Sequence, residues 1–190
     1  MTRLVAPLVA ATLLLAPTAH AASRPQLNDP KGDWRDAAQD VLWGRLSSVR
    51  GDDGPEVQGE LKLAAPPSVG GTIYRFAFTI GGCHEYSFAY EVPASEDSQL
   101  GAPNQPAMNY YDRCSGLPGS EADYRAHIEV KGDLLVWRAP YVGHLARGAI
   151  VRKFEGLACL TLTCGLGVTQ TGDTAEAAGY YVLGSDLPRR

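Results

Sequence analysis

The chain has 190 residues, of which 17 are Lys or Arg and 21 are Asp or Glu, so its formal net charge is -4 at pH 7. A nucleic-acid-binding function is not expected, because recognition of polyphosphate needs a positive field and this surface is mildly negative. Hydrophobic residues make up 45% of the chain, an ordinary share for a globular protein that excludes disorder over most of its length. The 21 Gly and 13 Pro predict many turns.

Residues 1–21 have the three parts of a removable export signal. Arg3 supplies the positive charge, residues 4–16 the apolar core, and Ala19-His20-Ala21 the small-x-small cleavage site. An apolar core of about 13 residues falls short of the roughly 20 that span a membrane. We therefore expect an extracellular protein without a membrane span, in which residues 22–190 form a single domain.

Aromatic and aliphatic residues alternate with polar ones along short segments, which predicts half-buried β-strands. Residues 74–80 and 86–92 flank a Gly-Gly turn and predict one hairpin, and residues 124–131 and 134–139 flank a Gly-Asp turn and predict another. Further strands are expected at residues 41–48, 57–64, 149–154, 157–162 and 180–183. Eight or nine short strands without a βαβ rhythm predict an all-β fold, an antiparallel and jelly-roll-like β-sandwich. A parallel nucleotide-binding fold is not expected.

Four cysteines lie in the predicted mature chain, and an even number favours two disulfides in an oxidising compartment. Their spacings of 30, 44 and 4 intervening residues lack the closely paired ligands of a zinc site. Of three possible connectivities we predict Cys83 with Cys114 and Cys159 with Cys164. A straight strand would hold the second pair about 16 Å apart, beyond the roughly 7 Å limit for a bridge. That segment must bend, or the second pairing is wrong.

A long segment, residues 93–123, is rich in Ser, Gly, Pro and Asn and has little strand pattern outside residues 108–111. Long loops of this kind often carry function. The predicted ligand-binding residues lie here, with one further contributor near the N-terminus: Asn109, Tyr110, Tyr111, Asp112, Arg113 and Trp34. Rings cover the apolar face of a sugar and planar polar groups meet its hydroxyls. Strand alternation would bury one of the two tyrosines, so only one is expected to face the ligand; alternatively, the tyrosines close the edge of the core.

Acidic residues gather just before the first predicted strand and just before the last. They are Asp29, Asp33, Asp40 and Asp173. These two strands can be neighbours in a sandwich, and converging carboxylates would form the oxygen-rich site that calcium prefers. The alternative is that Asp-Pro and Gly-Asp only form turns through bonds to their own backbone.

Several motifs resemble secreted β-sandwich modules of actinobacteria related to the DOMON and family-nine carbohydrate-binding superfamily. These are Asp29-Pro30-x-Gly32-Asp33, Leu135-x-Trp137-x-Ala139-Pro140 with Gly148, Asp173-Thr174-Ala175 and Tyr180-Tyr181-Val182. The resemblance covers most of the predicted mature chain. It implies a binding module, since members bind sugars or haem and often carry structural calcium. Haem is not expected here, because no motif places His84, His127 or His144 opposite Met108.

Common catalytic signatures are missing from the sequence: it has no G-x-S-x-G elbow, no H-E-x-x-H and no P-loop. We therefore expect a secreted, non-enzymatic module that binds carbohydrate or a cell-wall polymer. One alternative is a secreted hydrolase with paired carboxylates, whose spacing is spatial and does not show in a sequence. Another is a structural or interaction protein of the cell surface. No pattern indicates an oligomeric state.

Overall fold

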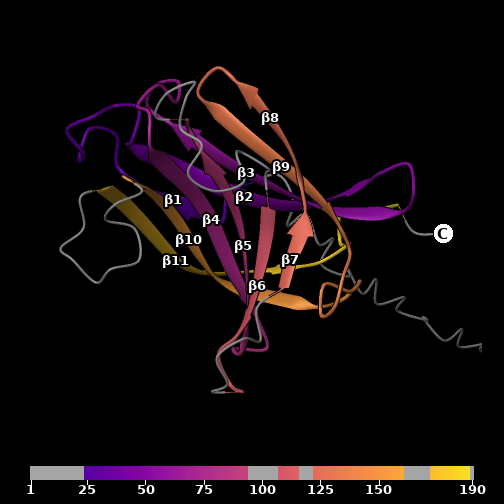
Figure 1. The fold of residues 1–190 in the computed structure, drawn as a ribbon. Coiled ribbons are helices and arrows are strands. Elements are labelled where there is room, and N and C mark those ends of the chain that lie inside the picture. The colour runs from indigo at the N-terminus through magenta and orange to yellow at the C-terminus, as the bar shows by residue number, and fades with distance from the viewer. Residues whose placement is uncertain (1–23, 94–106, 116–121, 161–171, 189–190) are drawn as a thin grey trace, which may run out of the picture.

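The computed structural model describes residues 24–93, 107–115, 122–160 and 172–188. This part of the chain contains eleven strands and no helix, and the strands form two antiparallel sheets that pack face to face (Figure 1). The predicted antiparallel β-sandwich is therefore confirmed. The described residues also contain no helix long and apolar enough to cross a membrane. The predicted export signal, residues 1–21, lies outside the described residues.

The two sheets divide the strands unequally. In spatial order, the five-stranded sheet contains β1 (Leu27–Asn28), β2 (Val41–Arg50), β3 (Pro55–Leu63), β9 (Leu134–Pro140) and β8 (His127–Lys131). The six-stranded sheet contains β11 (Gly172–Val182), β10 (Ile150–Leu160), β4 (Thr72–Ile80), β5 (His84–Glu91), β6 (Ala107–Asp112) and β7 (Ala122–Arg125).

The core lies between the sheets and is rich in aromatic side chains, as the alternation predicts. Phe76 and Phe78 on β4 are at most 1% exposed. Trp137 of the opposite sheet stacks on Phe88, with ring centroids 5.9 Å apart. Gly59 permits this packing, because a Cβ there would lie 2.6 Å from the Phe88 ring. These inward side chains leave the alternate residues of each strand to form the outer faces.

One of the predicted strands is divided into two in the structure. The predicted strand 124–131 is divided at Ala126 into β7 and β8, and these belong to different sheets. The chain crosses between the sheets there, since Tyr124 pairs with Met108 whereas Ile128 pairs with Trp137. An alternating sequence cannot distinguish one long strand from two short ones that bury side chains in the same core.

The predicted strands 149–154 and 157–162 are a single strand, β10, with a bulge at Lys153. Lys153 has a φ of 51°, and the bulge shifts the register so that Phe154 remains buried. The last strand, β11, begins at Gly172, earlier than the predicted residue 180.

The predicted disulfide between Cys83 and Cys114 is confirmed, with the two Cα atoms 5.2 Å apart. It joins the turn before β5 to the residues after β6, so it fastens part of the predicted long loop to the sheet. The second predicted pair stays a prediction, because Cys164 lies outside the described residues.

Candidate functional site

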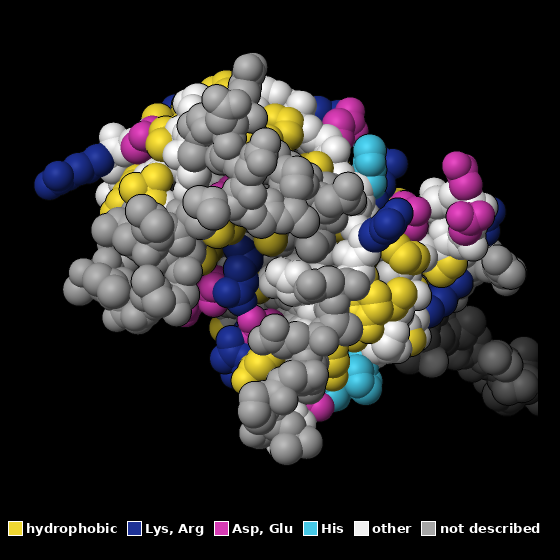
Figure 2. Space-filling model, in the orientation of Figure 1, with side chains coloured by type: hydrophobic (Ala, Val, Ile, Leu, Met, Phe, Trp, Pro, Cys, Tyr) yellow, Lys and Arg dark blue, Asp and Glu magenta, His cyan; other side chains and the backbone are white. Residues whose placement is uncertain are grey.

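The outer face of the six-stranded sheet contains a groove with a volume of about 550 Å³. Strands β4, β5, β10 and β11 form it, together with the segment that follows β6. Its polar lining residues are Thr79, Glu85, Arg113, Lys153, Glu155 and Glu176. In Figure 2, basic and acidic side chains gather around a hollow in the surface of the molecule. The groove is therefore a charged surface on the six-stranded sheet.

Glu85 forms the centre of the charge network in this groove. One of its carboxylate oxygens pairs with Arg75 of β4 and the other with Arg113, and its side chain is only 11% exposed. Two guanidinium groups share one carboxylate, so this cluster carries a surplus of positive charge. The Nε of Arg75 is buried and has no hydrogen-bond partner. The network fixes two planar donor groups beside the groove.

Two further carboxylates face the groove from neighbouring strands. Glu155 of β10 and Glu176 of β11 are direct cross-strand partners, and both line the groove. Directly opposed residues of antiparallel strands have Cβ atoms about 4.5–5.5 Å apart. Lys153, at the bulge of β10, lines the same groove and supplies a nearby positive charge.

Strand alternation separates the predicted ligand-binding residues into two groups. Tyr111 is 41% exposed and pairs across the strands with Glu85, so it lies on the outer face next to the groove. Asn109 lies on the same face, two residues earlier and opposite Ser87. Arg113 lines the groove itself. Three of the predicted residues therefore share the face that carries the groove.

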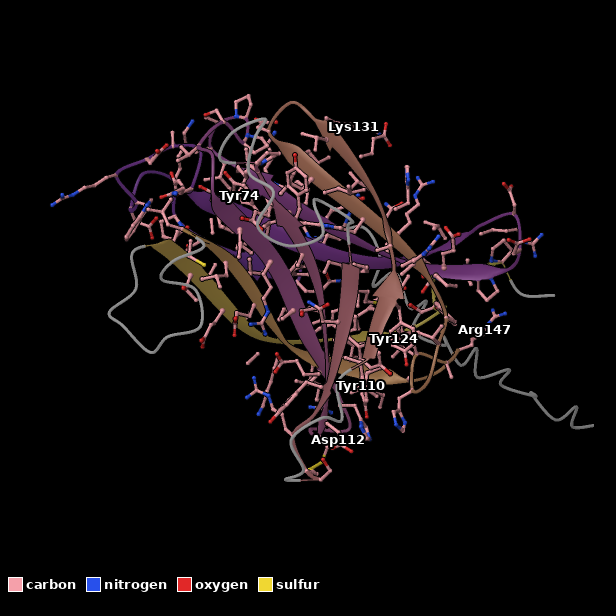
Figure 3. All side chains as sticks on the ribbon, in the orientation of Figure 1. Tyr74, Tyr110, Asp112, Tyr124, Lys131 and Arg147 are labelled. Atoms are coloured by element: carbon pink, nitrogen blue, oxygen red, sulfur yellow. A yellow bond between two sulfur atoms is a disulfide. The ribbon has the colours of Figure 1, made fainter. Side chains whose placement is uncertain are left out.

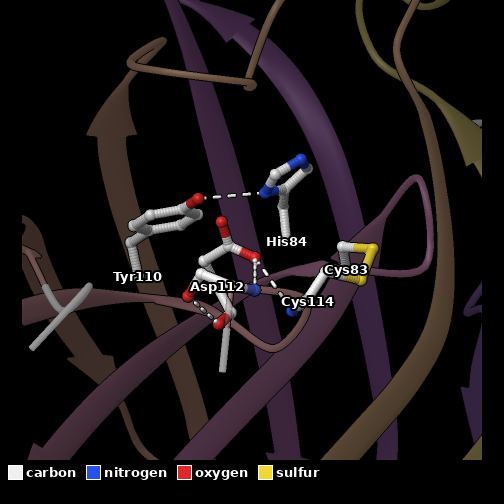
Figure 4. The surroundings of a disulfide bond; sticks show 6 residues. Cys83, His84, Tyr110, Asp112 and Cys114 are labelled. Carbon is white, nitrogen blue, oxygen red and sulfur yellow. Dashed lines mark hydrogen bonds between the residues drawn. A yellow bond between two sulfur atoms is a disulfide. The ribbon is translucent and has the colours of Figure 1, made fainter. Parts of the chain in front are cut away.

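Tyr110 points to the other face of β6, where it contacts the end of the core (Figure 3). Its hydroxyl is 2.9 Å from Nδ1 of His84, as Figure 4 shows, and its ring centroid is 5.0 Å from that of Tyr86. Burial raises the pKa of the Tyr110 hydroxyl. The imidazole of His84 in turn stacks on His144, with ring centroids 3.6 Å apart. Tyr110 thus belongs to an aromatic cluster at the end of the sandwich.

Asp112 and Trp34 do not join the groove. The Asp112 carboxylate accepts hydrogen bonds from the backbone N–H groups of Cys114 and Ser115, so it stabilises the turn that carries the disulfide (Figure 4). The Trp34 indole donates to Gln39, whose amide donates to Thr72 at the start of β4. Trp34 therefore lies near the opposite end of β4 from Asp112, at a distance of about 25 Å by strand rise.

The predicted acidic residues converge, although they come from distant parts of the sequence. Asp29, Asp33 and Asp173 each offer a carboxylate oxygen within 4.8 Å of the others. Asp40 adjoins them and accepts a hydrogen bond of 2.8 Å from the Gly32 N–H. Asp173, near the start of β11, accepts one of 2.6 Å from the N–H of Val41 at the start of β2.

The electrostatics of this acidic cluster suit a bound cation. Burial, followed by the charges of Asp173, Asp33 and Asp40, raises the pKa of Asp29 to about 6. Burial also raises the pKa values of Asp40 and Asp173, against hydrogen bonds that lower them. Asp29 Oδ2 and Asp40 Oδ1 are buried without a hydrogen-bond partner, and Asp40 is only 1% exposed. The donor set consists of carboxylate oxygens, which calcium prefers.

Comparisons with protein-family models, curated proteins and solved structures gave no match to this chain. The interpretation of the site therefore depends on its geometry. Four residues of the groove and its ion pairs were not among the predicted site residues: Arg75, Glu85, Glu155 and Glu176. Arg75 held an outward position of the predicted strand 74–80, and Glu85 stood just before the predicted strand 86–92, but a sequence does not show which outer face is hollowed.

Proposed function

We propose that this protein is a secreted, non-enzymatic module that binds carbohydrate or a cell-wall polymer in the groove of the six-stranded sheet. The observation that carries the proposal is the placement of Tyr111, 41% exposed, beside a groove of about 550 Å³ lined by Arg113 and Glu85. The resemblance of the sequence to secreted carbohydrate-binding sandwiches agrees with this proposal. Residues 1–21 would be removed during export, so the mature protein would act outside the cell.

The chemistry of the groove suits a sugar for two reasons. The Tyr111 ring offers an apolar surface to the C–H face of a sugar ring. The guanidinium of Arg113 and the carboxylates of Glu155 and Glu176 offer fixed donors and acceptors to its hydroxyls. Because ion pairs already hold Arg113 on Glu85, little side-chain entropy is lost when a ligand binds.

A pull-down on insoluble polysaccharides, with assay of reducing sugar released, tests this function. The mature protein should be depleted from solution by at least one polymer and should release no sugar. Tyr111→Ala should reduce retention about tenfold, a loss of about 1.4 kcal/mol, without a large change in melting temperature. Tyr110→Phe is the matched control and should bind like the parent, because its hydroxyl lies on the other face. Absence of depletion by every polymer would leave a structural or interaction protein.

A second candidate function is a glycoside hydrolase, and the cross-strand pair Glu155 and Glu176 favours it. Retaining enzymes use two carboxyl groups about 5–5.5 Å apart, a spacing within reach of directly opposed residues. The same assay separates the two functions. Release of reducing sugar that Glu155→Gln and Glu176→Gln each abolish, with retention on the polymer preserved, would establish catalysis and overturn the binding-module proposal.

We also propose that the acidic cluster holds a structural calcium ion, ligated by Asp29, Asp33 and Asp173 with Asp40 adjoining. An ion bound only by the native state adds RT ln(1 + [L]/Kd) to stability, about 2.7 kcal/mol at a hundredfold excess over Kd. Calcium should therefore raise the melting temperature, and Asp33→Ala should abolish the shift. Asp52→Ala, on the exposed turn between β2 and β3, is the control and should keep it. An unchanged melting temperature across millimolar calcium would contradict the proposal.

A further inference from the structure

A second cavity, of about 320 Å³, lies where the turn between β2 and β3 meets the C-terminal segment. Its lining residues are Arg50, Gly54, Pro55, Arg147, Leu187 and Pro188. No residue lines both this cavity and the groove of the six-stranded sheet. The cavity is therefore a candidate site separate from the proposed polymer-binding groove.

The lining of this cavity combines two guanidinium groups with apolar walls, and none of its lining residues is acidic. Within the described chain, Arg50 makes no ion pair or side-chain hydrogen bond. Among the described residues, the Arg147 side chain makes one long hydrogen bond of 3.4 Å, from Nη2 to the Pro188 carbonyl (Arg147 is labelled in Figure 3). Both groups thus keep most of their donors for a ligand.

Asp186, a half-buried acid that precedes the lining residue Leu187, does not line the cavity and is already hydrogen-bonded. One oxygen of Asp186 accepts a hydrogen bond from the Tyr181 hydroxyl, and the other accepts one of 2.9 Å from the Ser48 N–H. Asp52 and Asp53 are exposed at the tip of the hairpin and do not line the cavity. The lining of the cavity therefore carries two guanidinium groups and no carboxylate, on a protein whose formal net charge is -4.

The walls of the cavity are held by a buried hydrogen-bond network. The Ser48 hydroxyl accepts a hydrogen bond of 2.7 Å from the Gly184 N–H and lies 2.8 Å from the Tyr181 hydroxyl. The aliphatic part of Arg147 packs over Gly184, where a Cβ would lie 2.8 Å from Arg147 Cγ. The C-terminal wall and one of the two arginines are thus positioned before any ligand arrives.

We propose that this cavity binds a small organic carboxylate. The planar donors of Arg50 and Arg147 match the two oxygens of a carboxylate. Pro55, Leu187 and Pro188 cover its apolar body. Inorganic phosphate shares the oxyanion chemistry, but it has no apolar part for these walls to cover, so it binds more weakly.

Titration of hexanoate into the isotope-labelled mature protein, followed by amide NMR, tests the proposal. Hexanoate should shift the amides of Gly54, Arg147 and Leu187 saturably. Hexanol, which keeps the apolar body without the charge, and acetate, which keeps the charge without the body, should bind more weakly. Absence of any shift at tens of millimolar hexanoate would overturn the proposal. Phosphate that saturates the same amides as tightly as hexanoate would also overturn it, because the site would then select an oxyanion alone.

Arg50→Gln and Arg147→Gln should each weaken hexanoate binding about tenfold, the loss expected when one charge-assisted hydrogen bond is removed. Arg35→Gln is the matched control, because this exposed arginine lies in the loop before β2, at the other end of that strand. Equal hexanoate affinity in all three variants would contradict the assignment. Retention on polysaccharide should be the same in all of them, so this test is independent of the groove.

Discussion

Within the acidic cluster, the pKa of Asp29 is the most strongly raised. Its pKa of about 6 lies above the ordinary value of 3.8, because burial and three neighbouring carboxylates disfavour its charge. Between these two pH values the folded state binds more protons than the unfolded state, so stability falls as pH rises. The favourable contribution is complete below about pH 4 and is lost as pH passes 6.

We therefore expect the calcium-free protein to lose stability as pH rises from about 4 to just above 6. Asp29→Asn should remove part of this loss, about 1–2 kcal/mol after allowance for solvent screening. Denaturant unfolding at several pH values in the presence of a chelator measures it. Asp52→Asn, on the exposed turn, should follow the parent curve. If Asp29→Asn follows it too, the carboxylate is not the group responsible.

The residues of the acidic cluster could be predicted because they lie near the starts of the first predicted strand, β2, and of the last strand, β11, which contact each other in the sandwich. Alternation also predicted that one of Tyr110 and Tyr111 would be inward, although not which one. That choice depends on the register of β6, which burial of Met108 sets. The role of Glu85 could not be predicted, since its pairs with Arg75 and Arg113 require three strands in a particular order.

At the scale of the strand, β10 contains a backbone conformation that lysine rarely adopts. Lys153 has a positive φ at the bulge, a conformation that costs a non-glycine residue about 1–2 kcal/mol. Lys153→Gly should therefore leave stability unchanged or raise it by up to about 1 kcal/mol, because relief of strain exceeds the entropy cost of glycine.

Arg152→Gly is the control for this prediction, since Arg152 is the exposed neighbour on the same strand and has no positive φ. That change should destabilise the protein by about 0.5–1 kcal/mol. Denaturant unfolding of both variants provides the comparison. Equal destabilisation by the two changes would show that the bulge does not strain the backbone at Lys153.

The disulfide between Cys83 and Cys114 connects two elements at the edge of the groove. It closes a segment with a sequence separation of 31, so loop entropy predicts a stabilisation of about 3.7 kcal/mol. Arg113 is adjacent to Cys114, and its N–H donates to the Cys83 carbonyl. The Cys83→Ser, Cys114→Ser double variant should unfold at a lower denaturant concentration. It should also be retained less well on the polymer. Reduced stability with full retention would mean that the bridge does not position Arg113.

The hairpin β4–β5 and strands β2, β3 and β9 lie close to their predicted ranges, because clear turn residues bound each of them. The predicted boundaries are wrong where the chain changes sheets or forms a bulge, because the alternation of polar and apolar residues shows neither feature. At Ala126 the chain changes sheets, and at Lys153 an extra residue is absorbed without ending the strand. Strand β1 has only two residues, too few to give a periodic pattern.

At the scale of the whole molecule, the acidic cluster links the two sheets. Asp29 follows β1 of the five-stranded sheet, and its N–H donates to the Leu42 carbonyl. Asp173 belongs to β11 of the six-stranded sheet, yet its carboxylate accepts the Val41 N–H from the opposite sheet. A cation held by both carboxylates would add a second connection at the same edge of the sandwich.

Removal of calcium should therefore loosen one edge of the sandwich and leave the other unchanged. Addition of chelator should increase hydrogen exchange at the Gly32 and Val41 amides, whose acceptors are the cluster carboxylates. The Arg113 amide, bonded to the Cys83 carbonyl beyond the other end of β4, should keep its protection under native conditions. Asp173→Asn should show the loosened pattern with or without calcium. A uniform increase at all three amides would mean that calcium acts on global stability alone, and no increase would mean that the cluster does not connect the sheets through a cation.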